Sequence, residues 1–235
     1  MSNKIVSFSL WGDDPKYTIG AIKNAELVQE LYSGWIGRFY CGRSVPQDIL
    51  DKLNEVSNTE VILMDEEGDW TGMFWRFLSA DSDDVVLSRD TDSRVSEREV
   101  YAVNEWLESD KDFHIMRDHP YHGTQILGGM WGCRNGILKG IEESINEYSK
   151  GNFIQVDQNF LREHVWPKIS NNALSHDEFF VGTPLLNRLN NSIEYFNGVP
   201  FPKPRKDWND FVGQVYDEND NPTQEYAVML EASQT

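Results

Sequence analysis

The chain has 235 residues, 39% of them hydrophobic and 12% aromatic, with a formal net charge of −18. This composition supports one large folded domain with a substantial core and argues against intrinsic disorder. A surface this acidic repels nucleic acid and anionic membranes, so neither is expected as a partner. No run approaches the roughly 18 apolar residues of a membrane helix, and no signal-peptide stretch opens the chain. We therefore expect a cytoplasmic protein without an integral membrane segment, whose Cys41 and Cys133 are reduced thiols.

Strand and helix signals alternate through the first half of the chain. Short apolar runs predict strands at 4–10, 35–41, 60–64, 84–88 and 113–116. Helical spacing predicts helices at 21–32, 46–53, 73–80 and 96–107, the last opened by a capping box of Ser96 and Glu99. Parallel strands need crossover connections of this kind. The expected fold class is α/β, a single Rossmann-like domain with a mostly parallel central sheet flanked by helices.

The second half of the chain is less regular. A glycine-rich apolar stretch covers 126–134, and helical patterns follow at 137–148 and 157–165. Beyond Gly198 come three prolines and a polar tail. We expect one main domain over residues 1–198 and a C-terminal arm or lid over 199–235, which is either separate or part of the same domain.

The most informative stretch follows the fourth predicted strand. The apolar run ends in Arg89-Asp90-Thr91-Asp92, which places two carboxylates at the carboxyl end of a buried strand. Ligands of parallel α/β sheets bind beyond these ends. Mg²⁺ and Mn²⁺ prefer oxygen ligands and share their remaining positions with substrate phosphates. Asp90 and Asp92 therefore predict a site for one of these ions, the alternative being a surface turn.

Other nucleotide-binding and metal-binding motifs fit less well. The segment 217–221 resembles the start of a calcium loop, but Pro222 stands where glycine is required and Val228 where a bidentate glutamate belongs. Neither a Gly-x-Gly-x-x-Gly nor a Gly-x-x-x-x-Gly-Lys loop follows the first strand, which argues against NAD enzymes and P-loop NTPases.

An Asp-x-Asp after the fourth strand of an N-terminal α/β half resembles the GT-A superfamily of nucleotide-sugar glycosyltransferases. The upstream helix with Gly72, Trp75 and Arg76 is similar to one in several sugar-transferring families. The resemblance covers roughly residues 4–180, and only the Asp-x-Asp segment is specific. The chain resembles small glycosyltransferase-like proteins of bacteria and large viruses more than any single defined enzyme.

The resemblance implies roles for individual residues of this sequence. Ser9 and Trp11 would lie near the nucleotide base and ribose, and Arg76 or Arg89 would stabilise the donor's phosphates or sugar. Asp90 would face the ribose or sugar and the metal, and Asp92 would bind the metal most directly. The ion, Mn²⁺ or Mg²⁺, would act as a Lewis acid as the nucleoside diphosphate leaves.

Two further roles follow from the resemblance. Asp157 and Gln158 are similar to an Asp-Gln pair that lies close to the anomeric carbon in some retaining members, so they are the predicted catalytic residues and favour retention. The alternative for Asp157 is a helix N-cap. A third metal ligand is often a histidine from the C-terminal part of the domain, and His176 is the candidate, the alternative being a histidine that binds no metal.

Three other features have both a functional and a structural interpretation. Trp131, in a glycine-rich stretch, would stack on a sugar, or the stretch is a bulge in a buried strand. The histidines 114, 119 and 122 form a polar loop beside the pocket, or a zinc site whose geometry Pro120 disrupts. The basic residues 203, 205 and 206 close on the diphosphate or form a solvated linker.

The function predicted from the sequence is metal-dependent transfer of a sugar from a nucleoside-diphosphate sugar, with UDP favoured, to an unknown hydroxyl acceptor that is a glycan or a small molecule. One alternative is a nucleotidyltransferase or nucleotide-sugar hydrolase on a similar sheet. The acidic first loop, 10–15, argues against a nucleotidyltransferase, because those enzymes commonly carry a glycine-rich loop with a basic residue there. The other alternative is a non-catalytic module that binds a nucleotide sugar or a glycan.

Overall fold

The computed structural model describes residues 2–148, 151–187 and 192–223. Its centre is a seven-stranded sheet with the order β3-β2-β1-β4-β6-β5-β7. The strands are β1 (Lys4–Leu10), β2 (Ile36–Cys41), β3 (Thr59–Leu63), β4 (Val85–Arg89), β5 (Phe113–Arg117), β6 (Met130–Cys133) and β7 (Ala173–Asp177). Strand β6 runs antiparallel to both of its neighbours, and the other pairs are parallel. The predicted α/β class with a mostly parallel sheet is confirmed.

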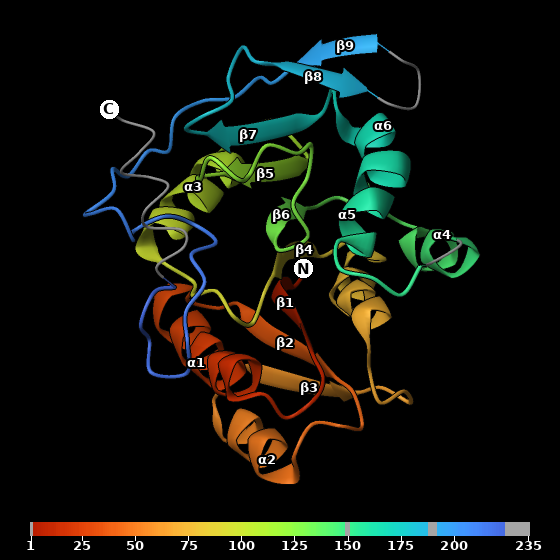
Figure 1. Cartoon of the computed structure of the whole chain (residues 1–235), viewed down its shortest axis with the longest axis vertical. Helices are drawn as coiled ribbons and strands as arrows, with labels where there is room; N and C mark the ends of the chain where they lie inside the picture. Colours follow the sequence, from red (N-terminus) through yellow and green to blue (C-terminus); the bar gives the residue numbers. More distant parts are fainter. Residues whose placement is uncertain (1, 149–150, 188–191, 224–235) are drawn as a thin grey trace.

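Helices cover both faces of this sheet (Figure 1). On one face lie α1 (Pro15–Leu31), α2 (Gln47–Glu55) and α3 (Glu97–Glu108). On the other lie the 3-10 helix η1 (Trp70–Ala80), α4 (Ile141–Glu147), α5 (Val156–Phe160), the π-helical turn η2 (Leu161–Val165) and α6 (Trp166–Ile169). A small hairpin of β8 (Pro184–Asn187) and β9 (Ser192–Tyr195) lies beyond β7.

The side chains of β1 divide between two hydrophobic cores. Val6, Phe8 and Leu10 pack in the core that α1, α2 and α3 cover. Ile5 packs in the second core, with residues of η1, α4 and α5. The strand is buried on both faces from Ile5 to Leu10, and this buried stretch includes the two small polar residues Ser7 and Ser9. The two cores hold the carboxyl ends of β1 and β4 side by side, since these strands pair directly.

The start of α3 shows half of the predicted capping box. The Glu99 backbone N–H donates to Ser96 Oγ (3.3 Å). The Glu99 carboxylate does not return to the cap; it accepts from Arg89 Nε (2.7 Å) and Tyr32 Oη (3.0 Å) instead. A buried arginine needs a charged partner, and this pairing ties β4 to α3.

The described part of the predicted C-terminal arm, residues 199–223, packs against the sheet domain. Phe201 and Val212 join a third apolar cluster with Met116 and Met130. The remaining residues, 224–235, lie outside the described part of the chain. Both cysteines are buried and free. Among the described residues, no helix has the length and apolar character to span a membrane.

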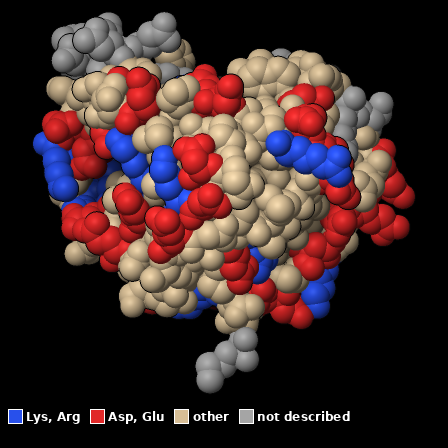
Figure 2. Space-filling view, turned by 90° about the horizontal axis from the view of Figure 1, so that it is seen from below, with Lys and Arg blue, Asp and Glu red and all other residues tan. Residues whose placement is uncertain are grey.

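The molecular surface carries the acidic excess of the sequence. Figure 2 shows Asp and Glu side chains spread over the face seen from below in Figure 1, with smaller groups of Lys and Arg among them. This distribution agrees with the net charge of −18.

Candidate functional site

A pocket of about 750 Å³ opens at the carboxyl ends of β1 and β4. Its volume is in the range of small-molecule sites, and its place matches the general rule for ligands of parallel sheets. Seven of the ten residues predicted for the site line it: Ser9, Trp11, Arg76, Asp90, Asp92, Asp157 and Gln158. The structure therefore brings most of the predicted site residues together around one cavity.

Arg76, from η1, joins two of the pocket carboxylates. Its Nη1 lies 3.1 Å from Asp90 Oδ1, and its Nη2 lies 2.7 Å from Asp157 Oδ2. The arginine is itself held in place, because its backbone N–H donates to Ser9 Oγ (2.9 Å). The guanidinium of Arg76 therefore links the tip of β4 to α5, and its backbone N–H links η1 to the tip of β1.

Two glycines make room for this arrangement. A Cβ atom added to Gly128 would overlap Asp157 Oδ2, and one added to Gly129 would overlap the carboxylate of Asp90. Only glycine allows the backbone to approach these side chains so closely. The glycine-rich stretch before β6 therefore has a packing reason that the sequence pattern did not specify.

Asp157 lies inside α5 and does not cap it, so the N-cap interpretation is wrong. The N-cap position belongs to Gln155, which has a left-handed conformation with φ of 71°. Asp157 is the second residue of the helix, and its Oδ1 accepts from the Gln158 backbone N–H (2.8 Å). This offset turns its other oxygen toward Arg76.

Asp92 has different partners from Asp90. Its Oδ2 lies 2.9 Å from Nζ of Lys16, in the first turn of α1. Its backbone carbonyl accepts from the N–H of Tyr216, in the C-terminal arm (2.8 Å). The same arm brings Gly213 and Val215 into the wall of the pocket.

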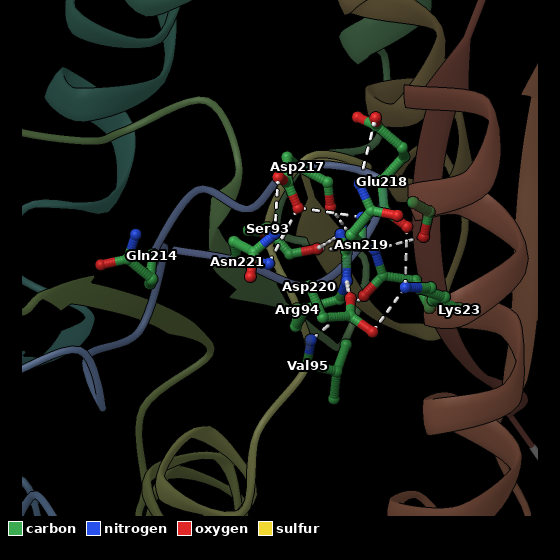
Figure 3. A network of polar contacts seen from close by, with 12 residues as sticks. Lys23, Ser93, Arg94, Val95, Gln214, Asp217, Glu218, Asn219, Asp220 and Asn221 are labelled. Atoms are coloured by element: carbon green, nitrogen blue, oxygen red, sulfur yellow. Dashed lines mark hydrogen bonds and ion pairs between the residues drawn. The ribbon is translucent and has the colours of Figure 1, made fainter. Parts of the chain in front are cut away.

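A polar network fixes this part of the arm (Figure 3). Lys23 of α1 and Arg94 both pair with Asp220, and Arg94 also donates to the Asp217 carbonyl (3.1 Å). The Asp217 carboxylate closes its own loop by accepting from the backbone N–H groups of Asn219 and Asn221. Arg94 stands two residues after Asp92, so the loop at 217–221 ties the segment that carries Asp92 to α1.

The electrostatics of the pocket favour a bound cation. Burial and the neighbouring Asp90 raise the pKa of Asp92, against the opposing effect of Lys16. Burial also raises the pKa of Asp157, and Arg76 opposes it. Five carboxylates line the cavity against a single arginine: Asp13, Asp14, Asp90, Asp92 and Asp157. Carboxylates this close together are stabilised as anions only by nearby positive charge.

The carboxylates of Asp90 and Asp92 suit a metal ion whose remaining ligands come from the substrate. Their side chains are 44% and 18% exposed and line the same cavity, so both present oxygens to a ligand. Among the described residues, no group of three or more His, Cys, Asp or Glu side chains could hold an ion alone. Two carboxylates with phosphate oxygens and water make the shell that Mg²⁺ or Mn²⁺ commonly takes.

Three predicted site residues do not line the pocket. Arg89 pairs with buried Glu99, because side chains alternate along β4 and Ser88 takes the opposite side. Trp131 is buried and stacks on Phe113, with ring centroids 5.4 Å apart.

His176 is the third of these residues. It is buried on β7, which β6 and β5 separate from β4 in the sheet. Its Nδ1 lies 2.8 Å from His114 Nε2, and its Nε2 lies 3.6 Å from Glu105. The order of strands therefore keeps this imidazole away from the tip of β4.

Other outcomes concern the remaining polar clusters. His122 lines the pocket, and its Nδ1 accepts from the Asp118 backbone N–H (3.1 Å). The basic residues of the arm do not line it: Arg205 pairs with buried Asp118 at 2.7 Å, and Lys203 pairs with Glu97. Lys16 was not among the predicted site residues, although a basic residue in the first turn of the helix that follows β1 was a usable signal.

Comparisons with known proteins agree on the architecture. No protein-family model matches the sequence, and no curated protein sequence matches it. Among solved structures, the fold is similar to that of glucosyl-3-phosphoglycerate synthase from Mycobacterium tuberculosis, in complex with Mn²⁺, UDP-glucose and phosphoglyceric acid. That match has a TM-score of 0.51 and 11% identity, and covers 85% of this chain and 90% of the other. At this identity the likeness establishes the fold alone.

Two other matches have lower TM-scores. One is a glycosyltransferase involved in glycosylation of the major capsid of PBCV-1, with 21% identity, a TM-score of 0.46, and coverage of 74% and 81% of the two chains. The other is 4-diphosphocytidyl-2C-methyl-D-erythritol synthase from Anaerococcus prevotii, with 12% identity, a TM-score of 0.47, and coverage of 76% and 90%. These scores are too low to support an argument about function.

Proposed function

Because the chain has the fold of the GT-A nucleotide-sugar glycosyltransferases, we propose that it is a metal-dependent glycosyltransferase. It would transfer a sugar from a nucleoside-diphosphate sugar to a hydroxyl acceptor, and a UDP-sugar is the favoured donor. The observation that carries the proposal is the position of Asp90 and Asp92, which leave β4 at the carboxyl edge and line one pocket with Arg76. The choice of UDP rests on the Mycobacterium tuberculosis enzyme, whose structure holds UDP-glucose and Mn²⁺.

Asp90 and Asp92 would hold Mn²⁺ or Mg²⁺ through their carboxylate oxygens. The ion, when bound, supplies Lewis-acid stabilisation of the charge that develops on the leaving diphosphate. Lys16 already lies beside Asp92, so its ammonium is within reach of a diphosphate that approaches the same carboxylate. Trp11, at the tip of β1, would lie beside the nucleotide base.

Asp157 and Gln158 would act at the sugar end of the donor. Both carboxylate oxygens of Asp157 are engaged, one by Arg76 and one by the Gln158 backbone N–H. We therefore assign Asp157 to positioning Arg76 beside the transferred sugar. The Gln158 side chain, which lines the pocket, would bind a sugar hydroxyl. Retention of the anomeric configuration stays a prediction of the Asp-Gln resemblance.

Isothermal titration of UDP and GDP, with and without Mn²⁺, tests the proposal. The proteins are the wild type, Asp92→Asn, and the matched control Asp65→Asn, whose carboxylate is exposed and outside the pocket. We expect Mn²⁺-dependent binding of UDP that Asp92→Asn abolishes and Asp65→Asn leaves unchanged. Binding that is indifferent to Mn²⁺ and to Asp92 would contradict the proposed site.

Turnover separates the enzyme from a silent binding module. Incubation with UDP-glucose and Mn²⁺ should release UDP slowly by transfer to water, even before the acceptor is identified. Intact Mn²⁺-dependent binding of UDP without any turnover, in the presence of acceptors, would favour the non-catalytic alternative.

A further inference from the structure

Exposed apolar side chains from three separate segments contribute to the lining of the pocket, and we call these three residues its apolar wall. Trp70, Tyr121 and Ile154 line the cavity and are 41%, 55% and 63% exposed. Large apolar side chains that converge at the mouth of a cavity mark a surface that a ligand covers. Aromatic rings offer flat apolar faces at little entropic cost, which suits a ring-shaped ligand with its own apolar face.

Trp70 and Ile154 each stand shortly before a residue of the Asp90–Arg76–Asp157 cluster, and Tyr121 stands before Gly128, which contacts Arg76. Trp70 opens η1, the helix that carries Arg76. Ile154 precedes α5, which carries Asp157, and Tyr121 belongs to the loop that leads to Gly128. The Gly128 carbonyl in turn accepts from Arg76 Nε (3.3 Å). The apolar wall therefore comes from segments that carry or contact Arg76 and Asp157.

The lining of the pocket also holds amide groups that the protein itself does not use. Gln155 and Gln158 line the pocket. Within the described residues, neither side-chain amide makes a hydrogen bond. Gln155 is exposed and has a positive φ of 71°, a conformation that costs free energy for a residue other than glycine. An amide offers two donors and an acceptor, which is the match for a pair of hydroxyl groups.

The charges of the cavity disfavour an anionic ligand. Five carboxylates line the cavity, and Arg76 is the single arginine or lysine among its lining residues in the described part of the chain. Both terminal nitrogens of Arg76 already pair with carboxylates. A phosphate or carboxylate on the acceptor would be repelled by these carboxylates, because Arg76 and Lys16 are already paired with them.

We propose that the acceptor is an uncharged carbohydrate, whose ring packs on Tyr121 and Trp70 and whose hydroxyls bind the Gln155 amide. This inference rests on the proposed function, since it names the acceptor class of the same pocket. It separates this chain from the Mycobacterium tuberculosis enzyme of similar fold, which was solved with phosphoglyceric acid, an anion.

Saturation-transfer NMR on the full chain tests the acceptor class. The probes are the methyl α- and β-glycosides of glucose, galactose, mannose, xylose, rhamnose and fucose, with 3-phosphoglycerate as the anionic comparison. Each is titrated with and without UDP and Mn²⁺. The variants are Tyr121→Ala, Trp70→Ala and the control Tyr101→Ala, because Tyr101 is also 55% exposed but lies on α3 outside the pocket.

We expect at least one glycoside to bind and 3-phosphoglycerate to bind more weakly. Loss of one stacked ring should weaken glycoside binding about tenfold in Tyr121→Ala or Trp70→Ala, with no change in Tyr101→Ala. All these side chains are exposed, so the variants should fold, and thermal unfolding checks that they do.

Three results would overturn the inference. One is that no glycoside binds, and another is that 3-phosphoglycerate binds more tightly than every glycoside. The third is that both substitutions weaken UDP binding and leave glycoside binding unchanged, which would assign the apolar wall to the donor. If UDP fails to bind while a glycoside still binds at Tyr121, the proposed function falls and the carbohydrate surface stands.

Discussion

The two aspartates of the Asp-x-Asp segment stand two residues apart and have contrasting surroundings. Asp90 faces a buried arginine that η1 and α5 enclose, together with two glycines that leave no room for a side chain. Asp92 faces a partly exposed lysine at the start of α1, and its backbone is held by the C-terminal arm. Packing therefore fixes one end of the pocket, while a screened ion pair and a surface loop define the other.

Substitutions at the two ends should therefore have different effects on folding stability and on ligand binding. Removing one member of a buried ion pair leaves an uncompensated charge and costs much of the stability of a domain, whereas a partly exposed pair contributes little. We expect substitutions at the Asp90 end to change folding stability and binding together. Substitutions at the Asp92 end should change binding with little effect on stability.

The largest expected effect is that of Asp157→Ala. It removes the 2.7 Å partner of Arg76, whose side chain is buried. Loss of a buried partner costs about 3 kcal/mol, toward the lower end of such cases because Asp90 still pairs with Arg76. Urea unfolding measures it. Asp83→Ala, which breaks the exposed pair with Lys139, is the control and should change stability by less than about 1 kcal/mol.

Gly129→Ala should come next. The added methyl group overlaps the Asp90 carboxylate, so the strand or the aspartate must move, at a cost of about 1–3 kcal/mol. Binding of UDP with Mn²⁺ should weaken in the same variant. The control is Gly37→Ala, where the nearest atom to a new Cβ lies at an ordinary 3.4 Å. Equal effects of the two substitutions would show that Gly129 does not shape the Asp90 end.

The sequence predicted the strand tips of the pocket better than the contacts between distant segments. Buried strands and crossover helices have strong periodic signals, so β1 to β4 and the tip bearing Asp90 and Asp92 followed directly. Pairings across the fold have no such signal. The partner of Lys16 and the pocket wall at Val215 depend on how the chain returns from far along the sequence. The prediction that Arg89 lines the site was wrong, because the resemblance does not specify toward which face of β4 the side chain points.

Acid should destabilise the protein through histidine. Burial, with the nearby charges of His119, Arg205 and Arg117, lowers the pKa of His122 from 6.5 to about 3. Between these two pKa values the unfolded chain binds a proton at His122 that the folded chain does not bind. The free energy of unfolding therefore falls as the pH drops from about 6.5 to about 3. This single group removes about 2 kcal/mol between pH 7 and pH 5.

Urea unfolding at several pH values between 7 and 5 measures this slope. His122→Asn should make the slope shallower, because the amide does not titrate while its oxygen can still accept from the Asp118 backbone N–H. A slope remains, since burial also lowers the pKa of His114 and of His176. His164→Gln, at an exposed position, should keep it. Asp92 and Asp157 have raised pKa values, so they do not add to the loss of stability in acid. An unchanged slope in His122→Asn would contradict this assignment.

The smallest effect on stability is expected for Lys16→Met. The pair that it breaks is partly exposed, so unfolding should change by less than about 1 kcal/mol. Titration of Mn²⁺ alone should show tighter binding, because the ammonium no longer competes for Asp92. A large loss of stability, or weaker Mn²⁺ binding, would remove the contrast between the two ends.

The most direct test of the account is to locate the metal. Crystals grown with Mn²⁺ and UDP, with diffraction data collected at the manganese absorption edge, would show the ion as an anomalous difference peak. We predict a peak within about 2.3 Å of a carboxylate oxygen of Asp92, with Asp90 and the diphosphate beside it. A peak held by other residues, or UDP in the pocket with no metal at Asp90 and Asp92, would contradict the central claim.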